Sequence, residues 1–276
     1  MKNIAELIQW FEHWANPTWQ EKWDNCGWQI EPGILDEPAR VLVCLTPTLA
    51  VMEEAIATHQ ESTLSQQGTP VNLIFAHHPL IFSPLKSIQK GDPIGDMVRL
   101  AIAHNIGIYS AHTNFDQVND GTADVLAQLL NLQDAVPVEP TQNGLGYGRV
   151  GNLQPALSLQ QLLERIQTAL NPPDLLVSPH ADRQQMIERV AVLGGSGASY
   201  IGSVSKTGAQ AYLTSDCKFH QFQESRDRNL ILIDAGHYAT ERPACSRLVE
   251  QFQQVGVDWV KLSDRDEDFR QFGRIA

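Results

Sequence analysis

Short apolar runs alternate with segments of helical periodicity along this chain, and that alternation limits the folds open to it. The short runs are typical of buried strands, and the longer segments are typical of helices that cover a sheet. In the first half, strands are predicted at 41–45, 73–76 and 107–110, and helices at 48–59, 92–105 and 121–130. In the second half, strands are predicted at 189–193, 210–213 and 230–233, and helices at 157–170 and 240–254. The pattern predicts an α/β protein with two lobes of similar rhythm, the first built on a largely parallel sheet.

A segment between the two halves is rich in proline, glycine and polar residues, which predicts a linker. It runs from Gln133 to Gly148 and divides the chain into an N-terminal lobe, 1–132, and a C-terminal lobe, 149–276. A chain of 276 residues holds enough material for two such lobes. Residues 60–69 are polar and predict a loop, residues 19–31 have turn character, and residues after 254 form a tail of mixed charge.

The net charge of −12 disfavours a nucleic-acid surface, because phosphate binding needs clustered lysine and arginine. No apolar run is long enough to span a bilayer. Residues 1–14 mix acids with apolar side chains, which indicates an amphipathic helix rather than a signal peptide. The four cysteines form no CxxC pair and are interpreted as reduced thiols. We therefore predict a cytoplasmic protein that binds neither membrane nor nucleic acid.

Two adjacent histidines, His77 and His78, follow the predicted strand 73–76 directly. Pro79 favours an extended backbone at His78, so the two side chains are expected to point to opposite sides. They are then poorly placed to chelate one ion as a simple pair, but well placed to reach two ions or two walls of one cavity. The carboxyl end of a strand in an α/β sheet is also where ligands usually bind. The alternative is a chance histidine pair in a surface turn.

Three further predicted strands lead to polar pairs that suit a metal site. The pairs are His112 with Asp116, Asp216 with His220, and His237 with Glu241. The last pair is spaced i, i+4, which puts both side chains on one face if a helix includes them. Histidine with carboxylate is a ligand set that zinc, manganese and iron accept, and a bridging carboxylate would let the set hold two ions.

Each of these polar residues also has an ordinary structural alternative. Asp116 can cap the following helix, and His237 with Glu241 can be an exposed helix pair. Asp216 and His220 can belong to a solvated turn, and His112 is more typical of a residue that supports a ligand than of a ligand itself.

A glycine loop, Gly194-Gly-Ser-Gly197, follows the predicted strand 189–193. Its backbone amides can hold an anion such as a phosphate, or the glycines can serve a tight turn with close helix packing. The loop lacks the Gly-Lys-Ser/Thr of a P-loop and does not match GxGxxG.

Seven of these segments, taken in order, resemble those of the Nif-three-like proteins, many of which are catalogued as GTP cyclohydrolase I type 2 or its homologues. The resemblance covers nearly the whole chain. The matching segments are Asp24-Asn-Cys-Gly-Trp-Gln29, Ala76-His-His-Pro-Leu-Ile-Phe82, Ala111-His-Thr-Asn-Phe-Asp116, Gly148-Arg-Val-Gly151, Gly194-Gly-Ser-Gly197, Thr214-Ser-Asp-Cys-Lys-Phe-His220 and Asp234-Ala-Gly-His-Tyr-Ala-Thr-Glu241.

The resemblance implies two related α/β lobes facing a dinuclear metal site, in a ring-shaped homohexamer. It implies two divalent ions per chain, zinc, manganese or iron, held by His77, His78, Asp116, His237 and Glu241. His112 and His220 then line the site and are expected to shuttle protons. The family name points to attack of water on C8 of a guanine nucleotide, followed by ring opening and loss of formate. The alternative is a metal-binding protein that works by storage or interaction without catalysis.

This chain departs from the family pattern at three positions. Leu45-Thr46 stands where the family often has a Leu-Asp pair, Trp28 replaces a smaller apolar residue, and Cys217 replaces an aliphatic one. None of the three is expected to touch the ligands. All three are expected to alter the choice of substrate.

Overall fold

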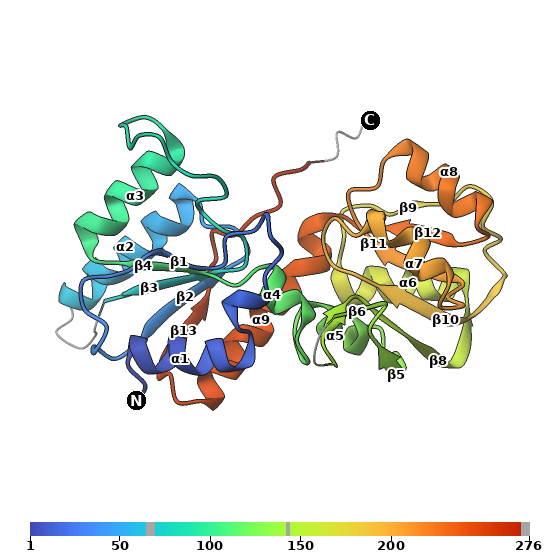
Figure 1. The fold of residues 1–276 in the computed structure, drawn as a ribbon, viewed down its shortest axis with the longest axis horizontal. Coiled ribbons are helices and arrows are strands. Elements are labelled where there is room, and N and C mark those ends of the chain that lie inside the picture. The colour runs from blue at the N-terminus through green and yellow to red at the C-terminus, as the bar shows by residue number, and fades with distance from the viewer. Residues whose placement is uncertain (65–69, 142–143, 272–276) are drawn as a thin grey trace. The chain divides into compact units, whose positions relative to one another are not determined.

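The computed structural model describes residues 1–64, 70–141 and 144–271, which form two compact units (Figure 1). The first unit is Met1–Phe115 with Cys245–Glu267, and the second is Asp116–Ala244 with Asp268–Ala276. Each unit is discontinuous in sequence, whereas the sequence boundaries treat each lobe as one continuous stretch. The chain passes between the units at 115/116, 244/245 and 267/268.

A five-stranded sheet forms the centre of the first unit, in the order β1-β4-β3-β2-β13. Its strands are β1 (Gly27–Ile30), β2 (Arg40–Cys44), β3 (Leu73–Ala76), β4 (Gly107–Ser110) and β13 (Trp259–Leu262). The inner strands are parallel and in register, with Cys44 opposite Ala76 and Ala76 opposite Ser110. The predicted strands at 73–76 and 107–110 are confirmed. The antiparallel edge strand β1 and the strand β13 at the other edge were not predicted.

Helices cover both faces of this sheet because successive strand residues point to opposite sides. On one face, Leu42, Ile74 and Ile108 pack against α2 (Leu49–Leu64) and α3 (Pro93–His104). On the other face, the ring of Phe75 lies 4.8 Å from Phe11 of α1 (Ile4–Trp14) and 4.9 Å from Phe252 of α9 (His237–Gln254). The loop predicted over 60–69 is wrong for residues 60–64, which continue α2, and residues 65–69 lie outside the described part.

A six-stranded mixed sheet forms the centre of the second unit, in the order β5-β8-β10-β11-β12-β9. Three strands of this sheet are parallel: β10 (Met186–Val192), β11 (Ala211–Thr214) and β12 (Ile231–Asp234). They correspond to the strands predicted at 189–193, 210–213 and 230–233. Antiparallel strands flank the trio: β8 (Arg149–Ser158) with β5 (Gln133–Val136) beyond it, and β9 (Leu176–Val177).

The segment 133–148, expected as a linker, forms strands in its described part. It supplies β5 and the short pair β6 (Glu139–Pro140) and β7 (Gly146–Tyr147), and residues 142–143 lie outside the described residues. Pro140 and Gly146 lie within these short strands, and Pro137 and Gly144 lie between strands, so the described part of the segment belongs to the sheets of the second unit.

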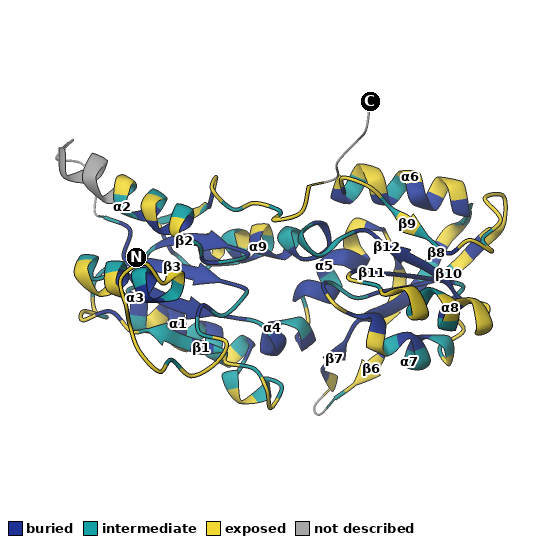
Figure 2. Ribbon diagram, turned by 90° about the horizontal axis from the view of Figure 1, so that it is seen from above, coloured by how far each residue is buried: buried dark blue, intermediate teal, exposed yellow. Residues whose placement is uncertain are grey.

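The second unit also has a helix layer on each face of its sheet. Leu213 and Ile233 pack in one cluster with α5 (Thr122–Leu129) and α6 (Leu159–Leu170), and Tyr212 and Leu232 pack in another with α7 (Ile201–Ser205). The remaining helices are α4 (Thr113–Gln117) and α8 (Phe219–Asp227). Figure 2 shows the central strands of both sheets as buried and the outer helix faces as exposed. No helix within the described ranges is long and apolar enough to cross a membrane.

Arg149 at the start of β8 is buried and fully engaged by hydrogen bonds. Its guanidinium donates to both carboxylate oxygens of Asp124 on α5 and to the carbonyls of Gly146, Gly148 and Val118. The side chain is 2% exposed. A buried charge with this many partners is stabilised only while all of them are present.

We predict that Arg149→Ala lowers the free energy of unfolding by about 3–5 kcal/mol, because it removes the cation that pairs with the Asp124 carboxylate and a donor to three carbonyls. Arg226→Ala is the matched control, since Arg226 is about half exposed and pairs with Asp227 on the surface. The control should change stability by no more than about 1 kcal/mol. Urea denaturation of both variants measures the difference, and equal effects would contradict this role for Arg149.

Candidate metal centre

Three histidines gather at the carboxyl end of the first unit's sheet. His77 and His78 follow β3 directly, and His112 follows β4 after one intervening residue. One potential ligand atom from each of the three lies within 4.8 Å of the others. The ring centroids are 5.2 Å apart for His77 and His78, and 5.5 Å apart for His78 and His112. The parallel register of β3 and β4 produces this cluster, because it brings both strand ends to one edge.

The Nδ1 atom of each of these histidines lies against a fixed polar group. His77 Nδ1 donates to the Ala111 carbonyl at 2.7 Å, and His112 Nδ1 donates to Asp24 Oδ1 at 2.9 Å. His78 Nδ1 lies 2.8 Å from the hydroxyl of Thr46. A carbonyl can only accept, so neutral His77 carries its proton on Nδ1 and presents the lone pair of Nε2. This arrangement is the usual one for a histidine that ligates a metal through Nε2.

Asp24 is the buried carboxylate that holds His112, and the sequence indicated only turn character here. Its side chain also accepts from the backbone N–H and the hydroxyl of Thr113, at 3.1 and 2.5 Å. Burial by itself raises the pKa of the Asp24 carboxyl, but the hydrogen bond and charge of His112 and the Thr113 hydrogen bond outweigh it and hold the pKa well below its usual range. Asp24 is therefore an anion at neutral pH.

Thr46, the first departure from the family pattern, places its hydroxyl 2.8 Å from Nδ1 of His78, where it orients the ring. The expectation that none of the three departures touches an expected ligand is therefore wrong for Thr46. The loop that carries Thr46 is capped by Asp266, whose carboxylate accepts from the backbone N–H of Leu45 at 2.7 Å and of Thr46 at 3.4 Å. A carboxylate therefore lies at this loop, but it comes from the C-terminal segment rather than from the residue after β2.

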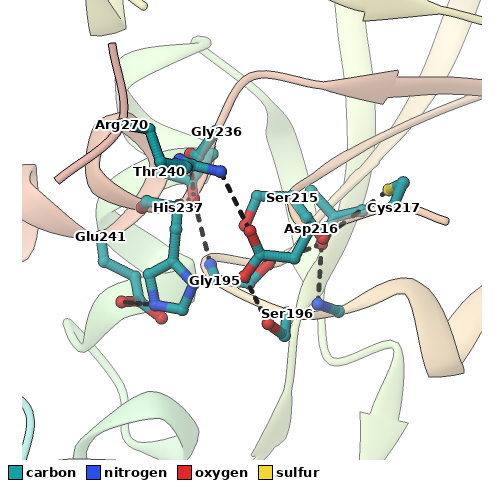
Figure 3. A network of polar contacts seen from close by, with 12 residues as sticks. Gly195, Ser196, Ser215, Asp216, Cys217, Gly236, His237, Thr240, Glu241 and Arg270 are labelled. Carbon is teal, nitrogen blue, oxygen red and sulfur yellow. Dashed lines mark hydrogen bonds and ion pairs between the residues drawn. The ribbon is translucent and has the colours of Figure 1, made fainter. Parts of the chain in front are cut away.

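The second unit also holds ligand-type side chains, at the start of α9 (Figure 3). His237 Nε2 lies 2.7 Å from Glu241 Oε2, one helical turn later, and His237 Nδ1 lies 2.6 Å from Asp216 Oδ2. The i, i+4 spacing predicted this shared helical face, and α9 begins at His237. Glu241 is 5% exposed, so the pair is not the exposed helix pair of the alternative interpretation.

Asp216 is fixed by three partners and by an unusual backbone. Its φ of 55° lies in the left-handed region, which costs energy for a residue with a side chain. Besides His237, its carboxylate accepts from the Ser196 hydroxyl at 2.6 Å and from Arg270 at 3.0 Å. These contacts, chiefly the His237 hydrogen bond, lower the pKa of the Asp216 carboxyl to about 2.

His237 lies between two carboxylates. Burial lowers the pKa of its imidazole, but the hydrogen bonds to Asp216 and Glu241 outweigh burial and raise the pKa to about 10. The imidazole is therefore a cation at neutral pH when no metal is bound. Because the raised pKa lies above the ordinary value, the stability that this charge contributes is complete below about pH 6.5 and is lost as the pH rises through about 10. A divalent cation would take the place of that proton.

The glycine loop after β10 serves close packing rather than anion binding. Its Gly195 amide donates to the Thr240 hydroxyl and its Gly197 amide donates to the Thr214 hydroxyl, both at 3.0 Å. Gly195 has a φ of +63°, and a Cβ there would lie well inside van der Waals contact of Oε1 of Glu241. The sequence left two alternatives open for this loop. The geometry favours the tight turn, which lets α9 pack closely against the loop.

The remaining expected residues lie in different environments. Asp116 is half-buried on α4, next to the point where the chain passes between units. His220 is exposed on α8, in a pocket with Gln223, Glu224, Asp227 and Arg228, and no described polar contact joins it to His237.

The Cys217 thiol donates to the Ser215 carbonyl, and burial together with the charge of Asp234 raises the pKa of that thiol well above its usual range.

The donors in both groups are imidazole nitrogens and carboxylate oxygens. This set suits zinc, manganese or iron. The histidine cluster of the first unit and the histidine–glutamate pair of the second can therefore take part in binding a metal ion. Sequence reasoning found the ligand-type residues but not their supports, Asp24 and Thr46, because both lie far from them in sequence.

Comparison with known proteins gives a consistent result. The model of a family described as Duf34/NIF3 (NGG1p interacting factor 3) matches residues 2–267. The chain is 71% identical over 269 residues to the GTP cyclohydrolase 1 type 2 homolog of Nostoc sp., covering 98% of each. It is 31% identical to the Protein NIF3 homolog of Schizosaccharomyces pombe, covering 97% of this chain and 95% of that one. Among solved structures, the Bacillus cereus protein related to NIF3 matches with a TM-score of 0.83 at 25% identity, covering 99% of both chains.

Gly195→Ala should weaken metal binding roughly tenfold or more, because the new Cβ displaces Glu241 and with it His237. Gly208→Ala is the matched control, since Gly208 also has a positive φ, +77°, but no atom lies within 4 Å of its Cβ position. Both variants carry the cost of a left-handed alanine, about 1–2 kcal/mol, and only the first should lose affinity for zinc. Isothermal titration with zinc measures this. Equal affinities would contradict the packing role.

Cys26 should alkylate about a thousandfold more slowly in the native protein than in urea at pH 8. Burial, the largest cause, together with the charge of Asp24 raises the pKa of its thiol to about 12, so the reactive thiolate forms only near that pH. Iodoacetamide labelling followed by peptide mass spectrometry gives the rate. Rapid native labelling of Cys26 would show that the Asp24 turn is open.

Proposed function

Because this chain belongs to the DUF34/NIF3 family, we propose that it is a metal-dependent hydrolase that acts on a nucleotide-like substrate. In this proposal two divalent ions, zinc, manganese or iron, are bound per chain. The ligands proposed from the family resemblance are His77, His78, Asp116, His237 and Glu241.

One observation carries the proposal: each of the four histidines has its Nδ1 against a fixed polar group. The four groups are the Ala111 carbonyl, the Thr46 hydroxyl, the Asp24 carboxylate and the Asp216 carboxylate. A histidine of ordinary core or surface structure has no need to expose one particular nitrogen. A metal ligand does, because orientation of the ring and choice of tautomer set the direction of its lone pair.

Bound divalent ions supply a hydroxide at neutral pH and polarise an oxygen of the substrate. His112 is the residue proposed to move a proton in the first unit, because Asp24 fixes its Nδ1 and thereby assigns the transfer to Nε2. Asp24 stays ionised and stabilises the imidazolium that forms. His220 receives no step in the proposal, since it is exposed on α8.

The alternative is that the same site binds metal without catalysis. Asp24 is the residue that distinguishes the two functions. A storage site needs ligands and their orienting groups. It does not need a buried carboxylate behind a histidine that the family resemblance leaves outside the ligand set. The ring-shaped homohexamer belongs to the proposal as well, and light scattering tests it against a chain mass of 30.7 kDa.

We predict two metal ions per chain by elemental mass spectrometry after loading the protein with zinc, manganese or iron. The double substitution His77→Ala with Glu241→Ala should remove the metal and leave the circular dichroism spectrum largely unchanged. His180→Ala is the control, because His180 is exposed and lies outside both groups. A double variant that kept two ions would overturn the ligand assignment.

We further predict that the metal-loaded protein releases formate from GTP, and that His112→Gln lowers the rate by about a hundredfold or more. His220→Ala should keep the rate close to that of the wild type. Full metal content with no formate from any nucleotide tested would favour the non-catalytic alternative.

A further inference from the structure

Two exposed aromatic side chains lie beside the three-histidine cluster in the first unit. Trp23 is 56% exposed and Phe82 is 51% exposed, and their ring centroids are 5.8 Å apart at an interplanar angle of 37°. The Trp23 ring also meets His112 edge to face, with centroids 5.9 Å apart. Single exposed aromatics are ordinary on a protein surface, but a contacting pair that adjoins a cluster of ligand-type residues needs a reason.

The turn that carries Trp23 is held in place at both ends. The backbone N–H of Asp24 donates to the Glu21 carbonyl at 2.9 Å, and the backbone N–H of Glu21 donates to the Thr113 hydroxyl at 3.0 Å. The Asp24 carboxylate then binds His112 and Thr113. The turn that orients His112 therefore also presents Trp23, and it does so without relying on burial of the tryptophan ring.

The loop that carries Phe82 is tied to the same region. The backbone N–H of Ile81 donates to Gln29 Oε1 at 3.0 Å, and its carbonyl accepts from Asn25 Nδ2 at 2.7 Å. Both polar groups of the residue before Phe82 are thus engaged by side chains that follow the Trp23 turn. The two rings are held side by side before any ligand arrives, which lowers the entropy lost on binding.

We propose that Trp23 and Phe82 form a stacking surface for a planar heteroaromatic ring of the substrate, next to His112. This inference rests on the proposed function and names the part of the substrate that the first unit recognises. A ring stacks at about 3.5 Å from each neighbour, so 5.8 Å leaves no room for one between the two aromatics, and the ligand lies on their exposed faces.

The surroundings favour a ring over an alkyl chain. Exposed polar or cationic residues lie close in sequence to the pair, namely Lys22, Asn25, Ser83 and Lys86, and the exposed apolar residues of the same stretch are Pro84 and Ile88. An alkyl chain would need a continuous apolar track, whereas a base needs one or two π-faces with polar groups at the rim. The two lysines also suit the negative charge that a nucleotide carries.

The test compares GMP with ribose 5-phosphate, which carries a hydroxyl at C1 where GMP carries the base. Binding to the zinc-loaded full-length protein is measured by isothermal titration. The wild type should bind GMP at least about tenfold more tightly than ribose 5-phosphate. Trp23→Leu and Phe82→Leu should reduce that ratio towards one, while Trp23→Tyr, which keeps a ring, should retain most of it.

Phe219→Leu is the matched control, because Phe219 is 81% exposed on the second unit and its described ring contact is with His220. It should leave the ratio unchanged. Elemental mass spectrometry of each variant should give the wild-type metal content, which separates loss of stacking from loss of the metal site.

Three results would overturn the inference. They are a wild-type ratio near one, an unchanged ratio in both leucine variants, and a change of oligomeric mass in Trp23→Leu with unaltered GMP binding. The last would assign the pair to a subunit contact. Base-dependent binding that needs Trp23, without formate release from GTP, would keep the stacking surface and reject the proposed reaction. Formate release with unaltered GMP binding in Trp23→Leu would support the proposed reaction and reject the stacking surface.

Discussion

The site depends on how the Nδ1 atoms of four histidines, the three expected ligands His77, His78 and His237 together with His112, are held in place. Four histidines at strand ends or helix starts would be free to rotate unless Nδ1 were held, and each is held by a different kind of group. The groups come from a strand end, a loop after β2, a turn before β1 and a loop after β11. Much of the polar structure around the site is explained by this need to fix rings rather than by stability.

The two units reach this result by different routes. In the first, parallel register brings the ends of β3 and β4 together, so histidines far apart in sequence become neighbours. In the second, one helical turn separates His237 from Glu241, and the close approach of the Gly195 loop keeps that turn in place. Asp216 has a left-handed φ of 55°, a conformation that aspartate tolerates, and its carboxylate contacts Nδ1 of His237.

Sequence periodicity predicted the inner strands and most helices because their burial is complete and their pattern is strong. It did not find β1 or β13, since β1 is an irregular edge strand that includes a bulge and β13 lies in a charged tail. The ligand-type histidines were predictable because imidazoles after buried strands are a local signal. Asp24 and Asp266 were not, because their roles depend on contacts with residues about 90 and 220 positions away in sequence. The choice between anion binding and packing at Gly195 likewise needed the position of Glu241.

We propose that imidazole Nε2 atoms and carboxylates, and no thiolate, bind the metal. X-ray absorption of the zinc-loaded protein tests this ligand set. We expect a first shell of nitrogen and oxygen at about 2.0–2.1 Å, with the outer-shell scattering that imidazole rings produce. A sulfur scatterer near about 2.3 Å, or a spectrum without imidazole scattering, would contradict it.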